Sequence, residues 1–291
     1  MKIVHSFWSK PSLNRDAKLE KSNGGWRHPK YYYMSWALSC LSFKKCYGEI
    51  ELVTDLEGKK MLIDQLELPY TSVKVELDLL NNYPVQLWAI GKLYTYGIQD
   101  TPFIHVDNDI YIWKKFGNRI ENASLVAQHT DKEEHYSMAL ERLKHYNIKI
   151  PSLLTEDYQN HKEFNCSNVG IIGGTNYPFF KEYVHKAFQF VDGNLDNITD
   201  TLMGSTYALV YEQYLFSAMA RKKRIEVQHL FEGKEEDIMD LTTFMNKYNQ
   251  SKYVHLLANK KQFFGRCREL EQQLILEYPE YHSRILSLFG T

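Results

Sequence analysis

At the centre of the chain the sequence runs Phe103-Ile104-His105-Val106-Asp107-Asn108-Asp109-Ile110-Tyr111. Its first four residues predict a short buried strand, and this strand leads directly into two aspartates two positions apart. Side chains two positions apart on extended backbone point to the same side. In an open α/β sheet, ligands bind beyond the carboxyl ends of the strands. The sequence therefore predicts a pair of carboxylates at the ligand-binding edge of a sheet.

The spacing of Asp107 and Asp109 predicts a cation site. Two acids between apolar segments repel each other without a cation, and their oxygens suit a hard divalent ion, Mn²⁺ or Mg²⁺. Such an ion can bridge the phosphates of a nucleotide diphosphate and neutralise its charge as it leaves. A solvated turn is the alternative, because Asp and Asn are common in turns, and the local context leaves both interpretations open. An EF-hand is excluded, since no glycine or further acid follows in Ile110, Tyr111 and Ile112.

The sequence on either side of this stretch alternates between strand-like and helix-like segments. This alternation predicts an α/β fold with a central, mostly parallel sheet flanked by helices. The expected strands are 2–8, 49–54, 72–77, 103–106, 124–129, 168–174, 225–230 and 253–256. The expected helices are 29–42, 57–66, 84–96, 133–145, 178–190, 207–221, 261–278 and 281–289. We expect one domain over residues 1–260 and a helical C-terminal extension over 261–291 packed on it.

Composition excludes several classes of protein. With 35 basic and 36 acidic residues the formal net charge is −1, so there is no basic field of the kind that binds nucleic acid. We expect no transmembrane segment, because no apolar run approaches about 20 residues. The N-terminus is too short and polar for a signal peptide. The cysteines fit no zinc pattern, which predicts free thiols and a cytoplasmic protein; they are Cys40, Cys46, Cys166 and Cys267.

A second polar group lies near the C-terminal end of the chain. His255 ends the expected strand 253–256, and Lys260 and Lys261 follow closely. A histidine and lysines in this arrangement can complete a cation site and neutralise phosphate. The alternative is a buried core histidine followed by solvated lysines.

Both groups resemble motifs of one enzyme class. Residues 103–111 resemble the Asp-x-Asp motif of nucleotide-sugar glycosyltransferases with the GT-A (Rossmann-like) fold, particularly the glycogenin-like and lipopolysaccharide-galactosyltransferase-like enzymes. Residues 255–261 resemble their late His-x-x-Gly-x-x-Lys motif, with Ala258 in place of the glycine. The resemblance implies that 1–260 is a nucleotide-sugar-binding and catalytic domain.

The resemblance also implies roles for individual residues. Asp107, Asp109 and His255 would bind the metal, usually Mn²⁺. Asp107 would also approach the donor's ribose, and Lys261 would grip the diphosphate.

Five further residues match the same families more loosely. Asn168 begins a segment like their Asn-x-Gly-Val, whose asparagine contacts the transferred sugar. Glu212 and Gln213 resemble an Asp-Gln pair beside the reacting carbon. Lys92 stands where relatives place a donor-binding Arg or Lys, and Trp8 ends the strand that borders the nucleotide base. Their alternatives are a buried strand for Asn168, a surface acid for Glu212, a solvated lysine for Lys92 and core packing for Trp8.

Together, the resemblance implies a metal-dependent glycosyltransferase of polysaccharide biosynthesis. It would move a sugar from a nucleotide-diphosphate donor, a UDP-sugar by default, to a saccharide or glycolipid acceptor. The order of motifs is like that of retaining enzymes, so retention is favoured. The alternatives are another nucleotide-binding metal enzyme (a nucleotidyltransferase or phosphohydrolase) and an inactive sugar-binding relative. The basic residues of the C-terminal helices leave open a peripheral contact with the inner face of a membrane, although we favour phosphate binding and a solvated face.

Overall fold

The computed structural model describes residues 1–13, 22–131, 133–160, 165–198, 202–232, 239–244 and 253–289. The chain divides into two compact units. Unit 1 comprises Met1, Leu79–His105 and Gly117–Glu232, and unit 2 comprises Lys2–Asp78, Val106–Phe116 and Gly233–Thr291. The predicted boundary at residue 260 stays a prediction.

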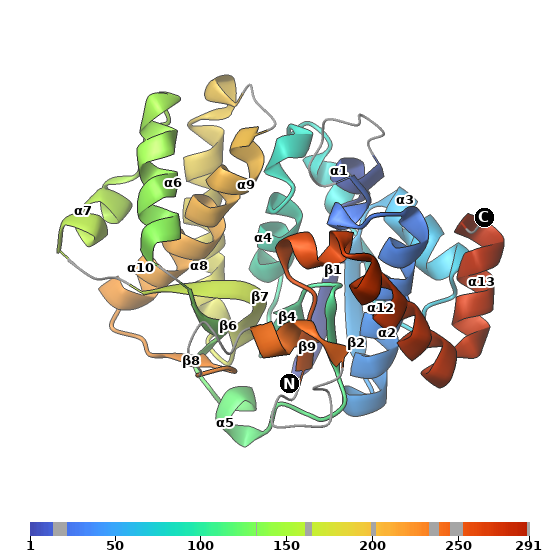
Figure 1. Cartoon of the computed structure of the whole chain (residues 1–291). Helices are drawn as coiled ribbons and strands as arrows, with labels where there is room; N and C mark the ends of the chain where they lie inside the picture. The colour runs from blue at the N-terminus through green and yellow to red at the C-terminus, as the bar shows by residue number, and fades with distance from the viewer. Residues whose placement is uncertain are drawn as a thin grey trace. The chain divides into compact units, whose positions relative to one another are not determined.

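Unit 2 is built on three parallel strands in the order β3-β2-β1, of which β1 and β2 are labelled in Figure 1. They are β1 (Lys2–Phe7), β2 (Ile50–Thr54) and β3 (Ser72–Val75). Every residue of β2 is buried, as expected for a strand covered on both faces. A separate antiparallel pair joins β5 (Ile110–Ile112) to β9 (Tyr253–His255). Its shorter elements are α1 (Ser9–Leu13), η1 (Ser22–Gly25), α3 (Leu56–Lys59), η2 (Lys60–Gln65), η7 (Met239–Thr242) and η9 (Ala258–Gln262), and η3 (Leu77–Leu80) crosses into unit 1.

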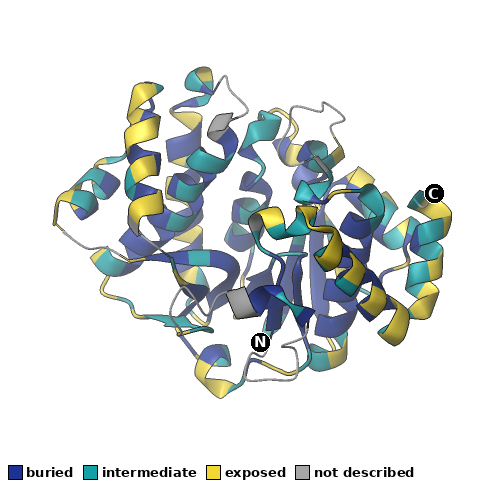
Figure 2. Ribbon diagram, viewed as in Figure 1, coloured by how far each residue is buried: buried dark blue, intermediate teal, exposed yellow. Residues whose placement is uncertain are grey.

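The main helix of unit 2 is α2 (Pro29–Tyr47). Pro29 occupies its first turn, and the His28 side chain caps it by accepting from the backbone N–H of Lys30. All residues from Tyr31 to Phe43 are buried (Figure 2), because the C-terminal helices α12 (Phe264–Glu277) and α13 (Pro279–Phe289) pack on α2. The segment after residue 260 is helical over α12 and α13, as expected, and it lies within unit 2; its status as a separate extension stays a prediction.

Unit 1 has four strands in the order β4-β7-β6-β8. They are β4 (Phe103–Val106), β6 (Leu125–Asp131), β7 (Cys166–Gly174) and β8 (Val227–His229), and β6 runs antiparallel to β7 but parallel to β8. A side chain on Gly173 would come within 2.1 Å of the Phe103 carbonyl oxygen, so this glycine permits the close approach of the two strands. The two units therefore confirm the predicted α/β class, with a mostly parallel set of strands.

Helices accompany the strands of unit 1. They are η4 (Val85–Leu87), α4 (Ile90–Gly97), α5 (Asn118–Glu121), α6 (Glu133–His145), α7 (Ser152–Asn160), α8 (Tyr177–Asp192), η5 (Leu195–Asn197), α9 (Leu202–Ala208), η6 (Leu209–Tyr214) and α10 (Leu215–Lys222). The expected helix over 84–96 is regular only from Ile90. The expected helix over 207–221 contains the π-helical turn η6 at its middle.

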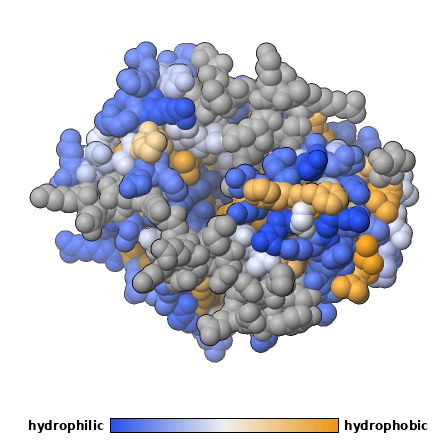
Figure 3. All heavy atoms as spheres, viewed as in Figure 1, coloured by the Kyte–Doolittle hydropathy of each residue, from blue (hydrophilic) through white to orange (hydrophobic). Residues whose placement is uncertain are grey.

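The structure bears on two predictions about the chain's surroundings. All four cysteines are free, as expected. Within the described residues, no helix combines the length and the apolarity that crossing a bilayer requires. Among the residues coloured in Figure 3, most are hydrophilic, and short apolar strips lie between them. The cytoplasmic location and the peripheral membrane contact stay predictions.

Candidate metal centre

The predicted acidic turn joins β4 to β5. The backbone N–H of Ile110 closes it by donating to the carbonyl of Asp107 at 3.2 Å. From α2, the buried Ser35 hydroxyl donates to the carbonyl of Asn108 at 2.7 Å and shares a 2.7 Å hydrogen bond with the Tyr111 hydroxyl. A buried serine therefore fixes the backbone between the two aspartates.

Strand pairing delivers the predicted histidine to this turn. In the β5–β9 pair, His255 lies opposite Ile110, and the backbone N–H of Leu256 donates to the Asp109 carbonyl at 3.1 Å. His255 Nε2 consequently lies 3.2 Å from Asp109 Oδ1. One ligand atom each of Asp107, Asp109 and His255 lies within 4.8 Å of the others. The three residues predicted to bind the cation thus converge within unit 2.

Lys261 reaches the same carboxylate from η9. Its Nζ lies 2.5 Å from Asp109 Oδ2 and donates to the Gly24 carbonyl at 3.2 Å. The thiol of Cys267 donates to the Lys261 carbonyl at 3.3 Å and holds the backbone of η9. The predicted phosphate-binding lysine therefore borders the aspartate that is predicted to bind the cation. The Ala258 side chain, which replaces the family's glycine, lies outside the described residues.

Charge keeps Asp109 ionised in spite of its burial. The residue is only 4% exposed, and burial alone would raise its pKa. The ammonium of Lys261 and the imidazole of His255 beside it outweigh this effect and hold the pKa of Asp109 well below its usual range. Its Oδ1 is also buried without a well-aligned hydrogen-bond donor, which leaves this oxygen able to bind a cation. Two carboxylates and an imidazole form a donor set that fits Mn²⁺, and less closely Mg²⁺.

Glu212 and Lys92 form a second buried ion pair, in unit 1. Glu212 lies in the π-helical turn η6 and is fully buried. Lys92 Nζ lies 2.8 Å from its Oε1, with side-chain exposures of 11% and 1%. The Tyr96 hydroxyl donates to the same oxygen at 3.3 Å. The alternatives of a surface acid and a solvated lysine are therefore wrong, because the helix buries both charges against each other.

The remaining predicted residues have local partners. Gln213 accepts a hydrogen bond from the Tyr136 hydroxyl at 2.8 Å. Asn168 is half-buried on β7, and its side-chain oxygen accepts from the backbone N–H of Gly170 at 3.1 Å. Trp8, in unit 2, is 5% exposed. Their roles toward a donor stay predictions.

A polar contact that the sequence did not reveal involves the loop Asn23-Gly24-Gly25. These three residues have φ values of 52°, 60° and 82°, in the left-handed region. A side chain on Gly24 would come within 2.4 Å of Tyr32 Cε2. The Asn-Gly-Gly run predicts a turn, but nothing local in it indicates that its carbonyls accept hydrogen bonds from the side chains of Lys261 and Gln262.

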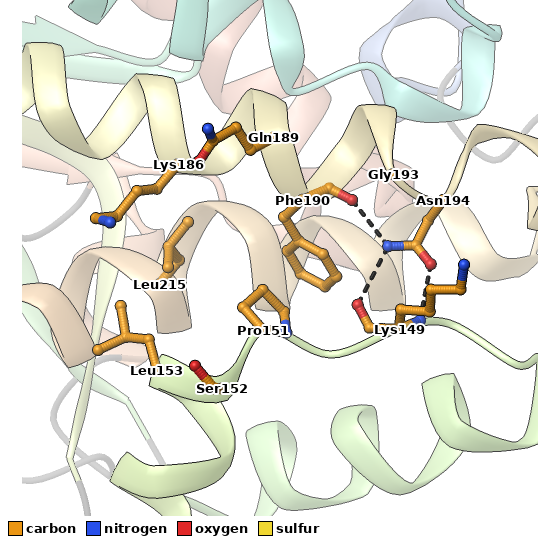
Figure 4. Close-up of a pocket in the computed structure, with 10 residues that line it drawn as sticks. All are labelled: Lys149, Pro151, Ser152, Leu153, Lys186, Gln189, Phe190, Gly193, Asn194 and Leu215. Carbon is orange, nitrogen blue, oxygen red and sulfur yellow. Dashed lines mark hydrogen bonds between the residues drawn. The ribbon is translucent and has the colours of Figure 1, made fainter.

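A pocket of about 340 Å³ lies elsewhere in unit 1 (Figure 4). Its lining residues are Lys149, Pro151, Ser152, Leu153, Lys186, Gln189, Phe190, Gly193, Asn194 and Leu215. The Asn194 amide donates to the carbonyls of Lys149 and Phe190, so this side chain ties the end of α8 to the segment before α7. The pocket wall includes none of the predicted site residues.

Comparison with known proteins gives one family and several similar structures. The galactosyltransferase LgtC, crystallised with donor and acceptor sugar analogues, is 10% identical with a TM-score of 0.49, and the match covers 100% of this chain and 97% of that one. The glycosyltransferase GlyE of Streptococcus pneumoniae TIGR4 is 9% identical with a TM-score of 0.44, covering 99% and 63%. No curated protein is significantly similar in sequence. The profile of a family described as "Family of unknown function (DUF6734)" matches residues 1–288, and the chain therefore belongs to the DUF6734 family.

Proposed function

We propose that the chain is a metal-dependent glycosyltransferase. It moves a sugar from a nucleotide-diphosphate donor, a UDP-sugar by default, to a saccharide or glycolipid acceptor. The observation that carries the proposal is the convergence of Asp107, Asp109 and His255, with the Lys261 ammonium beside them. Carboxylates, an imidazole and a lysine within one buried cluster are the groups needed to hold a cation and a diphosphate together.

Each residue of the cluster has a distinct task. Asp107, Asp109 and His255 would hold Mn²⁺ or Mg²⁺, which when bound neutralises the charge that develops on the departing diphosphate. Lys261 donates to phosphate oxygens from the same side, and its burial strengthens that interaction because little water screens it. Ser35 and the β5–β9 pairing hold the aspartate turn and His255 in place, so that no reorganisation is needed when the donor arrives.

The proposal keeps the sugar-side roles that the resemblance implies for Glu212, Gln213 and Asn168. The Glu212 carboxylate, paired with Lys92 at 2.8 Å, orients donor hydroxyls and stabilises positive charge at the reacting carbon. In an inverting reaction the same carboxylate would accept the acceptor's proton, although the order of motifs favours retention. π-Helical turns such as η6 are frequent at functional sites, which supports this assignment. Gln213 and Asn168 supply amides to the sugar, and Trp8 stacks on the base.

A donor panel tests the proposal. The protein is incubated with Mn²⁺ and a series of nucleotide sugars, and the released nucleoside diphosphate is quantified. We expect turnover of one donor class, loss of turnover when EDTA removes the metal, and recovery when Mn²⁺ is returned.

A thermal-shift series separates the proposed function from its alternatives. Nucleotide sugars plus Mn²⁺ should raise the melting temperature more than nucleoside triphosphates do, since a ligand stabilises the state that binds it. A shift by triphosphates alone would indicate a nucleotidyltransferase or phosphohydrolase. Sugar binding without any effect of Mn²⁺ or nucleotide would indicate an inactive relative.

A further inference from the structure

Lys261 pairs with the carboxylate of Asp109, to which a metal ion would also bind. Its ammonium lies 2.5 Å from Oδ2 of Asp109, and the two side chains are only 12% and 6% exposed. Water therefore screens this pair poorly, and the attraction is stronger than in a surface ion pair. A cation bound at Asp109 has to share this carboxylate with the lysine.

The net charge of the cluster explains why it matters that Lys261 and a cation share the Asp109 carboxylate. Asp107 and Asp109 contribute two negative charges and Lys261 one positive charge, so the cluster has a net charge of about −1 when His255 is neutral, as a metal ligand must be. A divalent ion reverses the sign of this cluster. A nucleotide diphosphate is negatively charged, so by pairing with Lys261 it compensates the positive charge that the ion adds.

Lys261 also has a second anchor for such a move. Its ammonium donates to the carbonyl of Gly24 at 3.2 Å, in the left-handed loop of η1. An ammonium has three donors, so this contact can persist while the bond to Asp109 is exchanged for one to a phosphate oxygen. The loop thus provides a fixed point for the lysine.

We propose that Lys261 is an internal counter-ion that opposes metal binding until a diphosphate arrives. In the metal-free protein it neutralises Asp109, and in the loaded protein it serves the diphosphate. Metal and nucleotide diphosphate consequently bind with positive coupling, each raising the affinity for the other by the same factor. The inference rests on the proposed function, since it needs both ligands at this cluster.

The test measures Mn²⁺ affinity rather than catalysis. Free Mn²⁺ is titrated by electron paramagnetic resonance with wild-type protein, Lys261→Met and the control Lys260→Met, each with and without UDP. Lys260 precedes Lys261 in the same segment, but its ammonium lies over the Phe263 ring at 5.5 Å. Coupling of ordinary strength changes affinity about 5- to 150-fold.

We expect Lys261→Met to bind Mn²⁺ about tenfold more tightly than wild type when UDP is absent. UDP should tighten Mn²⁺ binding to wild type and Lys260→Met by a larger factor than to Lys261→Met, in which only the direct contact between the ion and the phosphates couples the two ligands. Equal UDP-free affinities of Lys261→Met and wild type, or an effect of UDP that is as large in Lys261→Met as in wild type, would overturn the inference while leaving the proposed function intact. Absence of Mn²⁺ binding to every protein, with or without UDP, would reject both.

The integrity of the variant is checked by circular dichroism in EDTA. Should Lys261→Met fail to fold, Lys261→Gln replaces it under the same criteria, because glutamine removes the charge and keeps a hydrogen-bond donor.

Discussion

Each unit of the molecule buries a carboxylate against a lysine, yet the two pairs have different surroundings. Asp109 of unit 2 pairs with Lys261 and lies close to Asp107 and His255, the other residues predicted to bind a cation. Glu212 of unit 1 pairs with Lys92 beneath a tyrosine hydroxyl, and its backbone carbonyl accepts from the Tyr183 hydroxyl at 2.6 Å. Burial is common to both pairs, so it cannot distinguish their roles. The neighbours distinguish them: Asp107 and His255 lie beside Asp109, whereas tyrosine hydroxyls lie against Glu212.

The largest expected effect is on turnover. Asp109→Asn removes the charge of the central ligand, and we expect donor turnover to fall by more than about 10³-fold, equivalent to roughly 4 kcal/mol. The matched control is Asp64→Asn, which alters an exposed ion pair with Lys59 in the same unit. Comparable turnover of donor by Asp109→Asn and wild type in Mn²⁺ would break the distinction between the two pairs.

The next largest effect is expected on stability when one lysine of an ion pair is removed, and on whether Mn²⁺ restores that stability. Lys92→Met removes the ammonium that pairs with the buried Glu212, which should lower the free energy of unfolding by about 3–5 kcal/mol, and Mn²⁺ should not restore it. Lys261→Met should lose stability in EDTA and regain it in saturating Mn²⁺. Urea unfolding with and without the ion measures both. Restoration of Lys92→Met by Mn²⁺ would show that the two carboxylates are alike in metal binding.

The loss of stability in acid is expected to come from a residue outside both ion pairs. His5 is fully buried, and burial lowers its pKa to about 3. In the unfolded chain His5 has a pKa of about 6.5, so below this pH the unfolded chain binds a proton that the folded chain does not bind. The free energy of unfolding therefore falls as the pH drops through this window. We expect a loss of about 2 kcal/mol between pH 7 and pH 5. Asp109 contributes no loss there, because its depressed pKa keeps it ionised in the folded state and the unfolded aspartate is mostly ionised above pH 5.

The variant His5→Phe checks this assignment. It removes the ionisable ring and keeps an aromatic side chain among Trp36, Phe43 and Tyr70. Urea unfolding at the two pH values should give a flatter dependence than wild type. An unchanged slope would assign the acid sensitivity to other groups.

The smallest effect is expected from Ser35→Ala. This change deletes both hydrogen bonds that fix the aspartate turn, and should cost about 1 kcal/mol of stability. Removal of a group that orients a metal ligand typically weakens metal binding about 10- to 100-fold. Calorimetric titration with Mn²⁺ measures this change. Unaltered Mn²⁺ affinity would mean that the turn keeps its shape without the serine.

Sequence alone predicted the unit 2 cluster better than the unit 1 pair. Asp107 and Asp109 follow a strand whose apolar pattern is local, and His255 and Lys261 keep a fixed offset within one short segment. Lys92 and Glu212 lie far apart in the sequence, and their burial depends on aromatic packing around them that no local pattern expresses. The π-helical turn at Glu212 has no local signature for the same reason. Ser35 reads as one more residue of a buried helix until the turn that it holds is known.

The division of the chain into units has a consequence for biosynthesis. Unit 2 is assembled from three separate stretches, and its aspartates emerge from the ribosome long before His255 and Lys261. At about 5–20 residues per second, the nascent chain spends on the order of ten seconds with the acidic turn made and its basic partners not yet translated. Native closure of unit 2 therefore waits for the segment that carries His255 and Lys261, and the growing polypeptide cannot present Asp107, Asp109 and His255 together before that segment has been made.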